Sequence, residues 1–71
     1  MEQEHIGHKL RTARRGRKLT QMEVAVAVGV GRSTIAGIEK GHDLPGRETL
    51  VALAEYFDMP LDWLMSRIGE G

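Results

Sequence analysis

Residues 19–41 read LTQMEVAVAVGVGRSTIAGIEKG, and this stretch decides the fold. Thr20 and Glu23 have the spacing of a capping box, in which the hydroxyl and the carboxylate each accept a hydrogen bond from the other residue's backbone amide. Gly29 stands where a helix must stop and reverse, since glycine adopts a left-handed conformation without Cβ strain. The apolar residues that follow recur at helical spacing and end before Gly41. The stretch therefore predicts two short helices joined by a tight turn.

One part of this stretch also fits another structure. Residues 24–28 read VAVAV, with a β-branched residue at every second position, which is typical of a strand. The capping box in front of it and the lack of a second convincing strand favour a helix. With the apolar stripes on either side, the chain predicts an all-α domain of five helices. We expect them at 4–17, 20–27, 31–40 and 47–57, and from Pro60 onward with Leu61, Leu64, Met65 and Ile68 on the buried face.

The bulk composition is that of one small domain. The 71 residues predict a single domain over 1–71, with a core from about 6 to 68, and contain no cysteine for a disulfide or a thiolate metal site. No apolar run is long enough to cross a membrane, and the start of the chain lacks the pattern of a signal peptide. We expect a cytoplasmic protein without a metal or other cofactor.

The charges are unevenly distributed although their sum is zero. Between Lys9 and Gly41, eight Lys and Arg stand against two Glu, a net charge of +6. After Arg47, one Arg stands against five acidic residues, a net charge of −4. Such asymmetry favours a basic half that faces nucleic acid and an acidic half that faces solvent or a partner.

The order and spacing of several short pieces of the chain are informative together: Arg11, Arg14, Leu19-Thr20-Gln21, Glu23, Ala25, Gly29-Val30, Arg32-Ser33-Thr34-Ile35, Ile38-Glu39-Lys40-Gly41, Pro45, Leu53-Ala54-Glu55 and Leu61-Asp62-Trp63-Leu64. In these pieces, over residues 6–68, the chain resembles the Xre/Cro type, phage-repressor-like helix-turn-helix family. The resemblance implies a five-helix DNA-binding domain whose second and third helices form the helix-turn-helix. The implied partner is double-stranded DNA, and the implied role is sequence-specific regulation of transcription, with repression expected.

The resemblance implies that the start of the third helix reads base edges. Arg32 and Ser33 occupy these positions, with Ala36 and Gly37 one turn further on. An arginine there can pair with O6 and N7 of guanine, although a plain phosphate contact remains the alternative. Ala36 offers only apolar contact, and Gly37 either permits a close approach or weakens the helix. Gly31 replaces the Ser or Thr cap that is usual in the family.

A second group of residues is expected to hold phosphates. Gln21 does so in the family from the amino end of the second helix, where free amides favour an anion. Lys40 and Arg47 flank the loop 42–46, while Arg15, Arg17 and Lys18 add general attraction. The phosphate-contacting set that we predict is Arg11, Thr20, Gln21, Thr34, Lys40 and Arg47.

The resemblance also implies a structural ion pair between Arg14 and Glu39, which would fix how two helices cross. We expect Trp63 to be a core anchor of the fifth helix.

The expected assembly is a homodimer on a pseudo-palindromic operator, with the third helices about 34 Å apart. Its interface is expected at Met59, Pro60, Leu61 and Met65, which could equally be core residues.

Other chemistry finds little support. His5 and His8 have a spacing that can hold a metal, but only His42 joins them and no cysteine does. Ser33 has no His and Asp arrangement to activate it, so we expect no enzyme. The rival interpretation is an antitoxin or adaptor that binds a protein partner. Exposed apolar side chains such as Val26 and Ala27 would favour it, whereas only Gly69-Glu70-Gly71 follows the last helix as a partner-binding tail.

Overall fold

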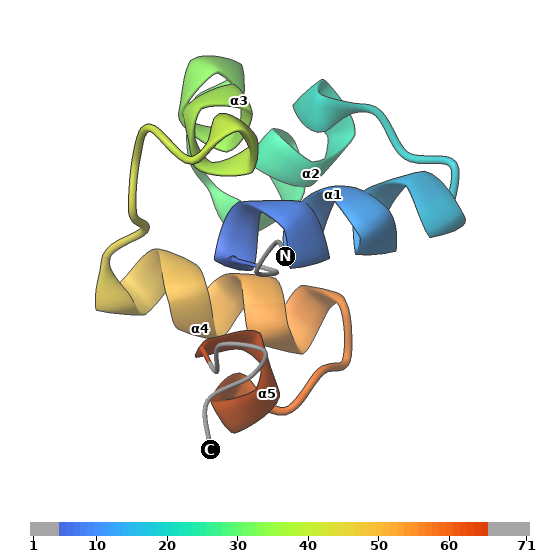
Figure 1. The fold of residues 1–71 in the computed structure, drawn as a ribbon. Helices are drawn as coiled ribbons and strands as arrows, with labels where there is room; N and C mark the ends of the chain where they lie inside the picture. Colours follow the sequence, from blue (N-terminus) through green and yellow to red (C-terminus); the bar gives the residue numbers. More distant parts are fainter. Residues whose placement is uncertain (1–4, 66–71) are drawn as a thin grey trace.

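A computed structural model describes residues 5–65 of the chain, which form five helices. In the view of Figure 1, α2 and α3 lie above α1, while α4 and α5 lie below it. Among the described residues, no helix has the length and apolar character needed to span a membrane. The predicted all-α fold is confirmed, with helices α1 (Ile6–Gly16), α2 (Gln21–Val28), α3 (Arg32–Lys40), α4 (Arg47–Tyr56) and α5 (Leu61–Met65).

The α2–turn–α3 unit forms as the sequence predicts. The Thr20 hydroxyl accepts from the Glu23 amide at 3.0 Å, and the Glu23 carboxylate accepts from the Thr20 amide at 2.7 Å. Residues 24–28 are helical, so the strand alternative is wrong. Gly29 ends the helix in a left-handed conformation with φ of 80°. The turn is thus built from a capped helix start and a glycine stop.

The other helix ends lie within two residues of the expected ones, and the end of α3 and the start of α4 coincide with them. His5 caps α1, since its Nδ1 accepts from the Gly7 amide at 3.0 Å, and Glu4 lies outside the described residues. Pro60 precedes α5 instead of opening it, and its carbonyl accepts from the Leu64 amide at 3.1 Å. Ile68 also lies outside the described residues.

The core brings together the apolar stripes of all five helices. Leu64 from α5 and Leu10 from α1 are buried as expected, while Leu61 is only half-buried. Burial of such side chains supplies most of the stability of a domain of this size. The buried apolar residues are Leu10, Val24, Ala25, Ile35, Ile38, Leu50, Leu53, Ala54, Phe57 and Leu64.

α1 and α3 approach each other closely at Gly7, a buried residue that the sequence analysis did not single out. A Cβ placed there would overlap the carbonyl oxygen of Ile38 and lie 2.9 Å from that of Glu39. Only glycine permits this approach, because both obstacles are backbone atoms of α3. Gly7 therefore sets the distance at which α1 and α3 pack against each other.

Two predictions at the junction of α1 and α5 are wrong. Lys9 belonged to the basic stretch assigned to nucleic acid, yet it is 2% exposed and its Nζ donates to the Trp63 carbonyl at 2.7 Å. Trp63 was expected in the core, but it is 45% exposed and its ring lies 4.7 Å from the Lys9 ammonium. Lys9 is thus buried, and its ammonium contacts both the carbonyl and the ring of Trp63.

Arg17, although exposed, packs against the end of α4. Its guanidinium donates to the carbonyls of Tyr56 at 3.3 Å and Phe57 at 2.8 Å, and lies 5.2 Å from the Phe57 ring. These carbonyls end α4, where a cation offsets the negative end of the helix dipole. The guanidinium of Arg17 therefore has partners within the protein, and its expected part in the general attraction of nucleic acid stays a prediction.

Candidate nucleic-acid interface

The amino end of α3 projects from the molecule. Gly31, Arg32 and Ser33 are exposed, whereas Ile35 and Ile38 on the opposite face of α3 are buried. The buried face fixes the helix to the core, so the exposed face is presented on a firm base. A rigid exposed helix of this kind fits the width of a DNA major groove.

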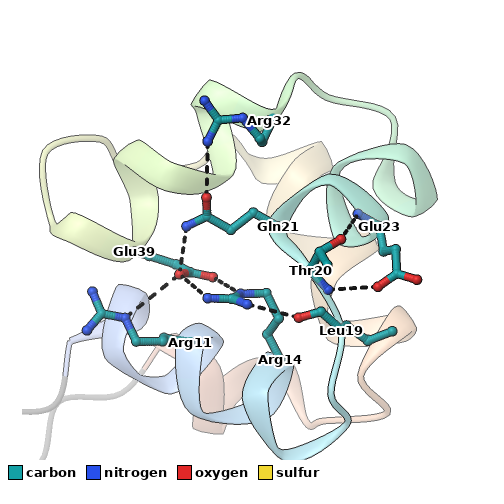
Figure 2. Close-up of polar contacts among 8 residues, drawn as sticks. All are labelled: Arg11, Arg14, Leu19, Thr20, Gln21, Glu23, Arg32 and Glu39. Carbon is teal, nitrogen blue, oxygen red and sulfur yellow. Dashed lines mark hydrogen bonds and ion pairs between the residues drawn. The ribbon is translucent and has the colours of Figure 1, made fainter.

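Behind α3, the carboxylate of Glu39 forms the centre of a polar network (Figure 2). Arg14 binds it in a bidentate manner, with Nε donating to Oε2 at 2.7 Å and Nη2 to Oε1 at 3.0 Å. The third guanidinium nitrogen, Nη1, donates to the carbonyl of Leu19 at 2.9 Å. Arg11 lies 3.8 Å from Oε1, and Gln21 Nε2 donates to the same oxygen at 3.1 Å. The network thus joins α1, α2 and α3.

The environment of Glu39 moves its pKa in two opposing directions. Burial, the largest influence, raises it, but hydrogen bonds from Arg14 and Gln21 and the charges of Arg14 and Arg11 bring the pKa below its usual value. The hydrogen bond to Glu39 in turn raises the pKa of Arg14. Both groups are therefore charged at neutral pH, and the pair is an ion pair in the folded protein.

Gln21 connects this network to the exposed tip of α3. Its Nε2 donates to Glu39, and its Oε1 accepts from Arg32 Nη1 at 3.2 Å (Figure 2). The sequence assigned Gln21 to a phosphate. The structure engages its side-chain amide within the protein, and the backbone amide at the first position of α2 is the group suited to an anion.

The remaining predicted phosphate contacts lie on α1, α3 and α4 and at the N-cap of α2, and they differ in exposure. Lys40 and Arg47 are exposed on either side of the loop 42–46, and Arg11 and Thr34 are half-buried. The Thr20 hydroxyl accepts within the capping box, so its own proton is the group that can be donated to an acceptor.

The two inner positions that were predicted to read bases are less exposed than the outer ones. Ala36 and Gly37 are both half-buried. Beside Gly37, the place of a side chain is taken by the Asp43 carboxylate, so that an added Cβ would overlap its Oδ2 and lie 3.0 Å from Cγ. The sequence analysis missed Asp43, because it lies in the loop that follows α3.

The predicted dimer surface is only partly exposed. Pro60 is exposed, whereas Met59 and Leu61 are half-buried and pack against the core. Met59 and Leu61 also line a shallow groove with Val51, Ala54, Glu55 and Asp58. The side chain of Met65 lies outside the described part of the structure.

The described residues include no cluster of three His, Cys, Asp or Glu side chains suited to a metal.

These features define a helix-turn-helix protein: a tight glycine turn, a second helix exposed at its amino end, and the buried Arg14–Glu39 ion pair that joins that helix to α1. The chain belongs to the helix-turn-helix domain family, whose model matches residues 7–70.

Relatives of the chain are named as regulators. It is 41% identical over 58 residues to the cryptic phage CTXphi transcriptional repressor RstR of Vibrio cholerae, covering 82% of this chain and 52% of that protein. It is 37% identical over 67 residues to the transcriptional repressor RghR of Bacillus subtilis, covering 93% of this chain and 50% of that protein. The chain thus spans about half the length of these relatives.

Solved structures agree with the fold. The P22 c2 repressor in complex with a synthetic operator superposes with a TM-score of 0.84 at 27% identity, over 87% of this chain and 94% of that one. The restriction-modification controller protein C.AhdI of Aeromonas hydrophila gives 0.77 at 28% identity, over 84% and 91%. The predicted resemblance to the phage-repressor-like family is confirmed.

Proposed function

We propose that this chain binds double-stranded DNA sequence-specifically, places α3 in the major groove and regulates transcription, most simply as a repressor. The observation that carries the proposal is the exposed tip of α3, where Arg32 is held by Gln21 against a buried ion pair. Such support limits the conformations of the arginine before it meets a base, which lowers the entropy lost on binding. The named repressors among the relatives agree with this role.

Within this proposal, Arg32 and Ser33 contact bases, and Ala36 contributes apolar surface. The side chains of Arg11, Thr20, Thr34, Lys40 and Arg47, and the backbone amide of Gln21, contact phosphates. The phosphate contacts fix the register of α3, and the base contacts specify the sequence. The protein acts in the cytoplasm as a homodimer on a pseudo-palindromic site, with Pro60 and its neighbours at the interface. Two-fold symmetry then spaces the α3 helices by about 34 Å.

Selection of bound sequences from a random duplex library, at one stated salt concentration, tests the function. Arg32→Ala should relax the preference at one base position in each half-site while changing non-specific affinity little, because an arginine–guanine pair discriminates by about 1–3 kcal/mol. The variant Arg15→Ala is the matched control, because Arg15 is an exposed arginine of α1. A uniform loss of affinity for all sequences would show that Arg32 contacts only phosphate. A folded wild-type chain that selects no duplex, even at low salt, would rule out the function.

A protein-binding role is the second candidate, and one observation favours it. Met22 and Val26 are 52% and 72% exposed one turn apart on α2, and Ala27 beside them is exposed as well. Apolar side chains grouped in this way mark interaction surfaces more often than scattered ones do. If the role is correct, Val26→Glu abolishes regulation in cells and leaves DNA affinity in solution unchanged. Unchanged regulation by this variant would exclude it.

A further inference from the structure

Gly37 lies in the middle of α3, where glycine weakens a helix relative to alanine. It stands four residues after Ser33 and therefore shares the face of α3 that Ser33 exposes. The space beside its Cα is filled by the carboxylate of Asp43, whose Oδ2 an added Cβ would overlap. The absence of a side chain at position 37 thus makes room for one that comes from the following loop.

The backbone holds Asp43 in this place. Gly41 is left-handed with φ of 84°, and its amide donates to the Ile38 carbonyl at 3.0 Å. The amides of His42 and Asp43 then both donate to the Gly37 carbonyl, at 2.9 Å and 3.2 Å. These bonds form a Schellman-type end that folds the chain back over the last turn of α3. Asp43 is therefore anchored by the same residue that its carboxylate covers.

The carboxylate itself is available to a ligand. Asp43 is exposed, and within residues 5–65 its side-chain oxygens have no hydrogen-bond or ion-pair partner. An ionised carboxylate is an acceptor only, so it attracts amino groups and repels phosphates and carbonyl oxygens. In the major groove the amino donors are cytosine N4 and adenine N6, and the latter has the N7 acceptor beside it.

We infer that Asp43, seated on Gly37, is a specificity-determining residue that accepts a hydrogen bond from cytosine N4. The inference rests on the proposed function, since it requires the exposed face of α3 to enter the major groove. It moves the base-reading role that was predicted for Gly37 to a residue of the loop. The same carboxylate disfavours a guanine O6 or thymine O4 at that position, because two acceptors then face each other.

The test compares sequence selection by the wild-type chain with that by Asp43→Asn and Gly37→Ala. Asp43→Asn keeps the size of the side chain and adds a donor, and Gly37→Ala displaces the carboxylate with a methyl group. Both should lose the preference for cytosine at the same position of each half-site, by roughly 5- to 100-fold, and keep the preferences at other positions. Asp43→Asn leaves the backbone of α3 unchanged, so it remains decisive if Gly37→Ala perturbs the helix.

The matched control is Glu48→Gln, which removes an equal charge at an exposed site in the first turn of α4, away from the groove at the expected dimer surface. A uniform gain in affinity that Asp43→Asn shares with Glu48→Gln would show simple relief of repulsion and overturn the inference, as would unchanged preferences at every position. A wild-type chain that selects no sequence would instead refute the proposed function, and the role of Asp43 with it.

Discussion

Glu39 is 3% exposed and has partners on two other helices, Arg11 and Arg14 on α1 and Gln21 on α2, so it joins the fold to the exposed tip of α3. Its replacement by glutamine should lower the free energy of unfolding by about 3–5 kcal/mol, because Arg14 would keep its charge without a balancing partner. Urea unfolding at neutral pH measures this loss. The control Glu55→Gln changes an exposed glutamate of α4 and should be nearly neutral. Equal stability of the two variants would contradict a structural role of the pair.

The pH dependence of stability follows from the lowered pKa of Glu39. A carboxylate whose pKa is lower in the folded state stabilises the protein fully above its usual pKa of 4.5, and this stabilisation is lost as the pH falls through the folded-state pKa. The difference in unfolding free energy between wild type and Glu39→Gln should therefore be constant from pH 7 down to about 5 and shrink in more acid solution. Urea titrations across this range measure it. A difference that is independent of pH would show that Glu39 does not titrate with folding.

The residues that sequence reasoning placed correctly are those whose cause is local. Thr20, Glu23 and Gly29 act within a few residues of themselves, so spacing alone predicts their roles. Lys9 and Arg17 depend on carbonyls 54 and 39–40 residues away, and no local pattern marks such partners. The position of Asp43 was not predicted for a related reason, since it depends on the Schellman-type end of α3, which places its carboxylate beside Gly37.

At the scale of elements, glycines with different backbone conformations end α1 and α2. Gly29 is left-handed and Gly16 is not, and a Cβ would meet no atom within 4 Å at either position. Gly29→Ala should therefore cost about 1 kcal/mol through backbone strain alone, while Gly16→Ala should stabilise the protein by about 0.5–1 kcal/mol. Thermal unfolding of the two variants shows the opposite signs. Destabilisation by both substitutions would imply that the end of α1 is also under strain.

Helical periodicity indicates the core well, and the helix ends less well. The buried residues of α4, Leu50, Leu53 and Ala54, recur at helical spacing in the sequence, because the 3.6-residue period is imposed by the backbone itself. The end of a helix depends instead on single capping groups, such as the His5 imidazole, which the expected start of α1 did not anticipate. The close contact of α1 and α3 at Gly7 could not be predicted from the sequence either, because it depends on which backbone atoms lie beside the glycine in the fold.

At the scale of the whole molecule, cations that donate to carbonyls within the protein should affect DNA binding less than exposed cations near the expected interface. Arg47 is exposed at the start of α4, whereas Arg17 donates to the carbonyls at the end of that helix. Arg47→Gln should reduce the slope of log affinity against log salt by about 0.9, the value for one phosphate contact. Arg17→Gln should leave the slope unchanged and lower stability. Binding titrations at several salt concentrations, on samples checked to be folded, measure both. A slope reduced equally by the two would place Arg17 at the interface.

The chain of contacts from Arg14 through Glu39 and Gln21 to Arg32 has a consequence for engineering. A designer who redirects this scaffold to a new target can vary positions 32 and 33, because both side chains are exposed and neither belongs to the core. Position 21 is different, since any replacement there must still donate a hydrogen bond to the buried carboxylate of Glu39. Libraries that randomise it together with the tip of α3 should therefore contain many clones of reduced stability, because Glu39 then loses a hydrogen bond.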